Sequence, residues 1–205
     1  MTNSLRNTVE WIAVVVVALV AALLIREYLI QAFEIPSASM ETTINEGDRI
    51  LVNKISYSVG EVERGDLVVF ERGTLVDGPT EELIKRAIAL PGETIELRDD
   101  GLIYIWGPEQ GPADAIALNE PYLPDDYGFP VPSTSDPLTT DIWHERCVNQ
   151  PREVGRCTLD GQSYFMMGDN RERSTDSRFF GPVPSENIVG KAFLRIWPPN
   201  AIGGF

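Results

Sequence analysis

The chain has 205 residues and carries 31 acidic against 17 basic side chains, a formal net charge of −14 at pH 7. Such acidity excludes nucleic acid as a partner, because a polyphosphate backbone repels it, and the length allows one domain with at most a smaller lobe. Hydrophobic residues at 43% and charged residues at 23% exclude a disordered chain, while 15 prolines and 17 glycines favour short strands over a helix bundle.

A long apolar run lies near the N-terminus. Residues 11–25 carry no charge, and the apolar stretch extends over the 22 residues 9–30. As a helix it would reach about 33 Å, enough to cross a bilayer. The alternatives are a buried helix and a cleaved signal peptide, but no polar stripe interrupts the run and no A-x-A-like site follows it closely. We therefore expect a retained transmembrane helix over residues 9–30, with the lipid bilayer as its partner.

Charges on either side of this run predict its orientation. Arg6 and the terminal amine precede it, whereas a glutamate-rich stretch begins behind it at Glu34. The positive-inside rule then makes residues 1–8 cytoplasmic and places the globular part outside the cell membrane. We therefore expect a single-pass protein of the cell membrane.

Behind the run, short stretches rich in β-branched and aromatic residues alternate with Gly, Pro and Asp turn signals. The predicted strands cover residues 49–52, 66–70, 83–90, 94–97, 102–106, 163–167 and 188–197. This pattern predicts mostly β structure.

Residues 99–145 differ in composition from the rest of the chain. They hold ten acidic side chains and no Lys or Arg, so they contribute −10 of the net charge. Seven prolines between Pro108 and Pro137 break helices and strand ladders. We interpret this stretch as a loop-rich insertion with a solvated acidic surface; a surface for a substrate or partner is the alternative.

The two cysteines, Cys147 and Cys157, lie ten residues apart. In an oxidising compartment they would close a short disulfide loop worth about 2 to 3 kcal/mol of loop entropy. Free thiols are one alternative, and a zinc site is another. Zinc would need more ligands than these two thiols and His144, the single histidine, can supply. A disulfide is the prediction.

Most hydrolase motifs are absent from the sequence. It contains no H-E-x-x-H, no G-x-S-x-G and no S-x-x-K. A Ser-His-Asp triad would depend on His144, which lies in the irregular insertion. A serine nucleophile with a lysine base remains, because burial can hold a lysine neutral.

The serine candidates lie in residues 35–44, directly behind the apolar run. Ser39 could attack there while Ser37 and a backbone N–H face the same point, although a serine-rich turn is the simpler interpretation. A reactive serine this close to a bilayer would act on membrane-bound substrates.

Lys85 is the best candidate for the base. Strand alternation places it on an apolar face where neighbouring alanines leave room for its stem, and such a face would lower its pKa. An ordinary surface lysine is the alternative. Lys54 and Lys191 have polar or glycine neighbours, and we expect both to be exposed.

A third cluster, residues 168–181, combines turn formers with opposite charges at short spacing. It suits a rigid loop braced by ion pairs, in which Ser174 could orient a lysine and Asp176 with Arg178 could hold the loop. A purely structural turn is the alternative.

Three motifs occur in order along the chain: P-S-x-S-M at 36–40, K-R-x-x-A-L-P-G at 85–92, and G-D-N-R-x-x-S-x-D-S-R-x-x-G at 168–181. Together they resemble the bacterial type I signal peptidases, and residues 64–70 look like a fourth box of that family. The order and spacing make the resemblance specific. It covers nearly all of the chain except the acidic insertion.

The resemblance implies roles for the matching residues. Ser39 would be the nucleophile, Lys85 the neutral general base, and the Ser39 N–H with the Ser37 hydroxyl the oxyanion hole. The supporting residues would be Ser174, which orients the lysine, Asp176 and Arg178, which brace the site, and Met40, which packs beside the nucleophile. The sequence departs from the family pattern at Thr42, where proline is usual, and at Glu93 and Glu172, where aspartate is common.

The implied protein is a serine endopeptidase that removes signal peptides from exported preproteins after A-x-A sites, beside the export translocon and without a metal or organic cofactor. Its fold would be an antiparallel β core of residues 31–98 and 161–205 with a cap lobe of residues 99–160. One alternative is a self-cleaving Ser/Lys protease related to stress repressors, disfavoured by the anchor and by the lack of an N-terminal DNA-binding domain. The other is a non-catalytic, membrane-tethered envelope domain.

Overall fold

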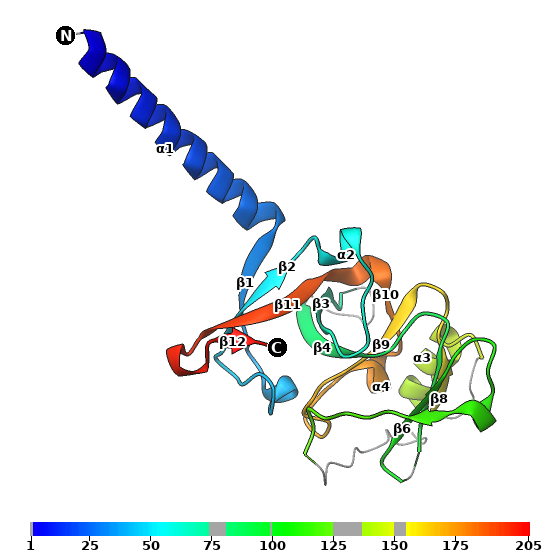
Figure 1. The fold of residues 1–205 in the computed structure, drawn as a ribbon. Helices are drawn as coiled ribbons and strands as arrows, with labels where there is room; N and C mark the ends of the chain where they lie inside the picture. Colours follow the sequence, from blue (N-terminus) through cyan, green and yellow to red (C-terminus); the bar gives the residue numbers. More distant parts are fainter. Residues whose placement is uncertain (1, 74–80, 99, 125–136, 150–154) are drawn as a thin grey trace.

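The computed structural model describes residues 2–73, 81–98, 100–124, 137–149 and 155–205. These residues form two antiparallel sheets and a long N-terminal helix that projects away from them (Figure 1). The predicted fold class, mostly antiparallel β, is confirmed.

The larger sheet carries the motifs. Its strands follow the order β1-β2-β11-β3-β4-β9-β10, with β12 paired to β11. Since β11 lies between β2 and β3, the C-terminal part of the chain closes the middle of the sheet. The strand bounds are β1 (Ile30–Glu34), β2 (Arg49–Asn53), β3 (Leu67–Glu71), β4 (Glu82–Ala89), β9 (Ser163–Met167), β10 (Val183–Pro184), β11 (Ile188–Trp197) and β12 (Gly203–Gly204).

The smaller sheet has the order β7-β6-β5-β8. Its strands are β5 (Thr94–Leu97), β6 (Ile103–Trp106), β7 (Ile116–Ala117) and β8 (Arg156–Thr158). The strand β5 precedes residue 99, so this sheet also includes residues that lie before the expected cap lobe of residues 99–160. The strand β6 matches the strand predicted at residues 102–106, whereas β7 and the helix α3 (Pro137–Arg146) make the described part of the acidic insertion more regular than expected. Proline is tolerated in the first helical turn, so Pro137 begins α3 rather than breaking it. Residues 125–136 of the insertion lie outside the described part.

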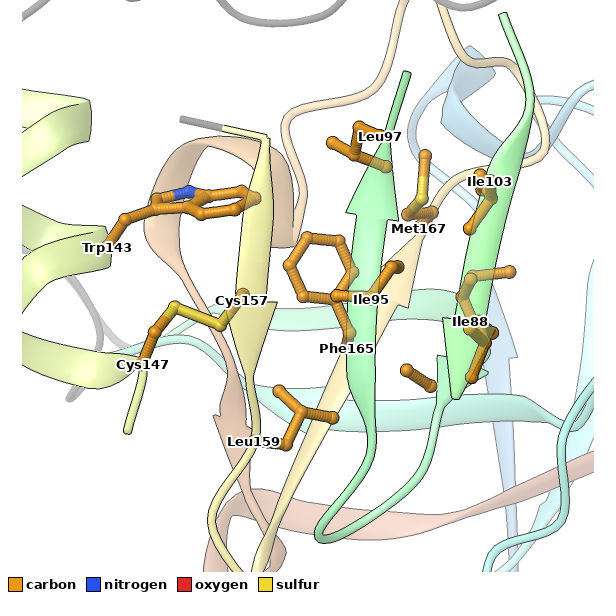
Figure 2. Packing of buried hydrophobic residues seen from close by; sticks show 12 residues of the cluster. Ile88, Ile95, Leu97, Ile103, Trp143, Cys147, Cys157, Leu159, Phe165 and Met167 are labelled. Carbon is orange, nitrogen blue, oxygen red and sulfur yellow. A yellow bond between two sulfur atoms is a disulfide. The ribbon is translucent and has the colours of Figure 1, made fainter. Parts of the chain in front are cut away.

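One apolar cluster joins the two sheets (Figure 2). Trp143 from α3 packs edge-on against Phe165 from β9, with ring centroids 5.6 Å apart. Next to them, Cys147 and Cys157 form a disulfide that ties the end of α3 to β8. Trp143 also donates its Nε1–H to the Arg178 carbonyl at 3.0 Å, so α3 is attached to the loop that follows β9.

The helix α1 spans Thr2–Tyr28. The predicted helix over residues 9–30 is wrong at its C-terminal end, because Ile30 pairs with Asn53 in the ladder between β1 and β2. Among the described residues, no helix combines the length and the apolar character that crossing a bilayer requires. The predicted transmembrane anchor is therefore not confirmed.

Two short helices complete the scaffold around the motifs, together with several single 3₁₀ turns. The helices are α2 (Ser56–Val59) and α4 (Ser177–Phe180), and the turns are η1 (Ala38–Met40), η2 (Pro112–Asp114), η3 (Ser185–Asn187) and η4 (Pro199–Ala201).

Candidate active site

Ser39 lies in the turn η1, which follows β1. Its neighbour Met40 is fully buried and packs with Ile44 in the apolar cluster beneath β2 and β3. The N–H groups of Thr43 and Ile44 both donate to the Met40 carbonyl, at 3.1 and 2.8 Å, which closes the turn. Burial of Met40 therefore fixes where the Ser39 side chain starts.

Lys85 reaches Ser39 from β4, which lies between β3 and β9 in the interior of the sheet. Only 2% of Lys85 is exposed, and its Nζ donates to the Ser39 Oγ at 2.7 Å and to the Ile84 carbonyl at 2.9 Å. Burial lowers the pKa of this amine from 10.5 to about 8, although Asp176 and Asp169 partly oppose the shift. At pH 7 roughly one such lysine in ten is neutral, against about one in 3,000 for an ordinary lysine.

A small cavity adjoins this pair. It has a volume of about 50 Å³ and is lined by residues of β1, the segment 35–39, β2, β3 and β4, including Ser37, Ser39 and Lys85. The exposed Ser37 donates its hydroxyl toward the Ser39 Oγ at 3.4 Å, a long hydrogen bond. The cavity thus places a serine oxygen, an amine and a second hydroxyl around one space.

Ser174 is placed differently from the prediction. Its side chain is 5% exposed, and its hydroxyl has no hydrogen-bond partner among the described residues, so the expected bond to Lys85 is absent. The Ser174 hydroxyl instead lies against Gly168, where a methyl group would overlap both it and the carbonyl oxygen of Ser39.

Asp176 and Arg178 form a fully buried ion pair. The guanidinium donates to both carboxylate oxygens, at 2.9 Å from Nε and 3.0 Å from Nη2. Asp176 also accepts from the Gly168 N–H at 2.9 Å, and Arg178 donates to the Arg171 carbonyl at 2.6 Å. The pair therefore ties the two ends of the loop 168–178 together, and Ser174 lies within that loop.

A second buried pair, which the sequence reasoning missed, lies beside Lys85. Arg86 donates to both oxygens of Asp169, at 2.8 Å from Nε and 2.5 Å from Nη2. Thr43 joins them, since its hydroxyl donates to Asp169 at 2.5 Å. Next to Asp169, the Asn170 N–H donates to the Ser39 carbonyl at 3.1 Å. These bonds connect β4, the loop after β9 and the segment behind Ser39.

Comparison with known proteins assigns the family. The model of the family described as signal peptidase, peptidase S26, matches residues 8–197. The chain belongs to this family. It is 30% identical to the signal peptidase IB of Staphylococcus aureus (strain Mu50 / ATCC 700699) over 193 residues, which is 94% of this chain and 91% of the relative.

A further relative and a solved structure are also similar. The signal peptidase I of Bacillus licheniformis is 32% identical over 204 residues, covering 98% of this chain and 95% of the relative. The crystal structure of a signal peptidase I from Enterococcus faecalis V583 is 27% identical, with a TM-score of 0.43, and covers 65% of this chain and 97% of that one. As a member of the signal peptidase family, the chain is a serine endopeptidase.

Thr42 is the departure from the signal peptidase motif with a clear structural consequence. Its φ is 78°, in the left-handed region, whereas a proline ring holds φ near −65°. The backbone at this position therefore has a conformation that proline cannot adopt. Glu93, the second departure, pairs with Arg64 at 2.6 Å and accepts from the Leu90 N–H at 2.7 Å.

Two further residues, each in contact with a buried arginine beside the site, come from the acidic insertion. Glu120 pairs with the buried Arg171, and the Tyr122 ring lies over the Arg86 guanidinium, 3.8 Å from its carbon to the ring centroid. The interpretation of the insertion as a solvated surface is wrong at these positions. Arg86 and Arg171 stand in the recognised motifs, but no sequence signal distinguishes Glu120 from its acidic neighbours. No group of three His, Cys, Asp or Glu side chains in the described residues is arranged to hold a metal ion.

Proposed function

We propose that this signal peptidase removes signal peptides from exported preproteins by acyl transfer, with Ser39 as nucleophile and Lys85 as general base. The observation that carries the proposal is the 2.7 Å hydrogen bond from the Lys85 amine to the Ser39 hydroxyl. A protonated amine donates in this bond, and a neutral amine in the same place can instead accept the hydroxyl proton. The lowered pKa of Lys85 supplies that neutral form near pH 8.

The reaction then runs in two halves. Lys85 takes the proton of Ser39 as the serine oxygen attacks the scissile carbonyl, and the protonated amine returns it to the leaving peptide nitrogen. Water, activated by Lys85, next attacks the acyl-enzyme and releases Ser39. The Ser39 N–H and the Ser37 hydroxyl would donate to the negative oxygen in both halves.

The cavity beside Ser39 supports a preference for small side chains before the cut. A volume of about 50 Å³ suits a methyl group better than a branched or aromatic side chain. An extended substrate there would lie beside the end of β4 and β1, in the manner of an added strand.

We expect purified protein to cleave a precursor after an A-x-A site. Changing the alanine directly before the cut to leucine should lower kcat/KM by about 100-fold or more, because the larger side chain does not fit the cavity. A precursor with leucine at the second position before the cut is the control and should be cleaved at a nearly normal rate. Equal cleavage of all three substrates would contradict the proposed specificity.

We also propose that α1 attaches the protease to a lipid bilayer, near the translocon from which preproteins emerge. Large apolar side chains around this helix are exposed; examples are Val9 at 61%, Trp11 at 70% and Leu23 at 55%. Burying such surface in lipid is favourable. The full chain should float with phospholipid vesicles on a density gradient, whereas a chain lacking residues 2–28 should stay at the bottom. Flotation of both forms to the same extent would assign the membrane contact to another surface.

A further inference from the structure

A short segment of the acidic insertion, residues 118–123, lies against the loops that hold Ser39 and Lys85; we call it the strap. It leaves the smaller sheet beside β7, where the Leu118 N–H donates to the Ile103 carbonyl at 2.8 Å. The Leu123 N–H donates to the Glu120 carbonyl at 3.0 Å, which closes a turn. Glu120 and Tyr122 lie within this turn.

Glu120 neutralises a buried arginine. The Arg171 side chain is 1% exposed and that of Glu120 is 12% exposed, and both guanidinium Nη atoms donate to the carboxylate, one of them at 3.0 Å. Arg171 also donates from Nε to the Gly168 carbonyl at 3.0 Å. A buried guanidinium without its carboxylate is strongly unfavourable. Loss of the Glu120 charge would therefore draw Arg171 toward solvent and pull on Gly168.

Tyr122 makes the second connection. Its hydroxyl donates to Glu120 at 2.6 Å and its ring stacks on Arg86, the residue next to Lys85. Its carbonyl accepts from the Thr42 hydroxyl at 3.3 Å. Thr42 lies three residues after Ser39 and holds the left-handed backbone conformation, so this bond helps to stabilise a strained turn.

We propose that Glu120 and Tyr122 are positioning residues for the Ser39–Lys85 pair, acting through Arg171 and Arg86. The strap contacts the loop 168–171, β4 and the segment behind Ser39, which are the three elements that meet at the pair. Neither residue touches the reacting atoms. The proposal rests on the proposed function, since it needs a cleavage assay in which wild-type protein is active.

The test compares Glu120→Gln with Glu96→Gln. Glu96 is a matched control because its side chain is 14% exposed and bonds two arginines, Arg98 and Arg156, on the smaller sheet. Both variants should lower the melting temperature. Well below that temperature, Glu120→Gln should lower kcat about tenfold or more with KM within about twofold, whereas Glu96→Gln should leave both within about twofold.

A second pair of variants tests the proposal if Glu120→Gln fails to fold. Tyr122→Leu removes a ring stacked on Arg86, and Tyr104→Leu removes a ring stacked at 3.6 Å on Arg98 of the smaller sheet. Only Tyr122→Leu should lower kcat. The proposal is overturned if kcat of the folded Glu120 and Tyr122 variants stays within about twofold of wild type. It is also overturned if kcat falls by as much in the two control variants. If wild-type protein itself leaves the precursor intact, the proposed function fails instead.

Discussion

Replacing Ser39 by alanine or Lys85 by methionine should abolish precursor cleavage, lowering kcat/KM by at least about 10³-fold. Ser39→Ala removes the oxygen that forms the acyl-enzyme. Lys85→Met keeps an unbranched side chain of similar length but removes the amine that accepts the proton. Because only 2% of Lys85 is exposed, an apolar side chain fits this position, and we expect the variant to fold with a melting temperature near or above that of wild type.

The other two lysines provide the control. Lys191 pairs with Asp66 at 2.6 Å and is 37% exposed, and Lys54 donates to Gln31 at 3.1 Å. Lys54→Met and Lys191→Met should therefore cleave the precursor at nearly the wild-type rate. More than about a tenth of wild-type activity in folded Lys85→Met protein would rule out the lysine as the base.

Gly168→Ala should lower kcat by about 100-fold, because a misplacement of about 1 Å at a catalytic group has an effect of this size. The added methyl group would overlap the Ser174 hydroxyl and the carbonyl oxygen of Ser39. Backbone atoms cannot rotate away as a side chain can. Relief therefore requires moving the loop 168–178 or Ser39 itself.

Two glycines allow this effect to be separated from a loss of stability. At Gly161 an added methyl group meets no atom within 4 Å, so Gly161→Ala should change neither stability nor kcat. At Gly190 it would overlap the Asn53 carbonyl of β2, and β3 lies between Gly190 and the strand that carries Lys85. Gly190→Ala should lower the melting temperature without lowering kcat of the folded protein. An equal loss of kcat in both clashing variants would contradict a specific role for Gly168.

Local signals in the sequence were sufficient for the core strands. The strands predicted at residues 66–70 and 83–90 match β3 and β4 to within one residue at each end. Their β-branched and apolar residues are buried in the sheet interior, so propensity and burial favour the same structure. Strand β1 was missed because Ile30 continues an apolar run, and only its pairing with Asn53 shows that the helix has ended.

The residues of the candidate site were likewise predictable only in part. Ser39 and Lys85 stand in motifs, and their proximity was predictable. The Ser174 hydroxyl was expected to bond Lys85, but its direction depends on how tightly Gly168 packs, which no local pattern reveals. The pairing of Glu120 with Arg171 spans 51 positions and joins two loops. The local sequence around Glu120 does not distinguish it from the other acidic residues of the insertion.

The pH dependence of kcat/KM is the most direct measurement of whether a lysine is the base. With a Lys85 pKa of about 8, the active neutral form should increase about tenfold per pH unit below pH 8 and level off above it. The profile should be measured on a precursor without ionisable side chains near the cut. A rise with a midpoint near pH 8 is the predicted result. A profile that is flat from pH 6 to pH 10, or that falls through this range, would contradict the account.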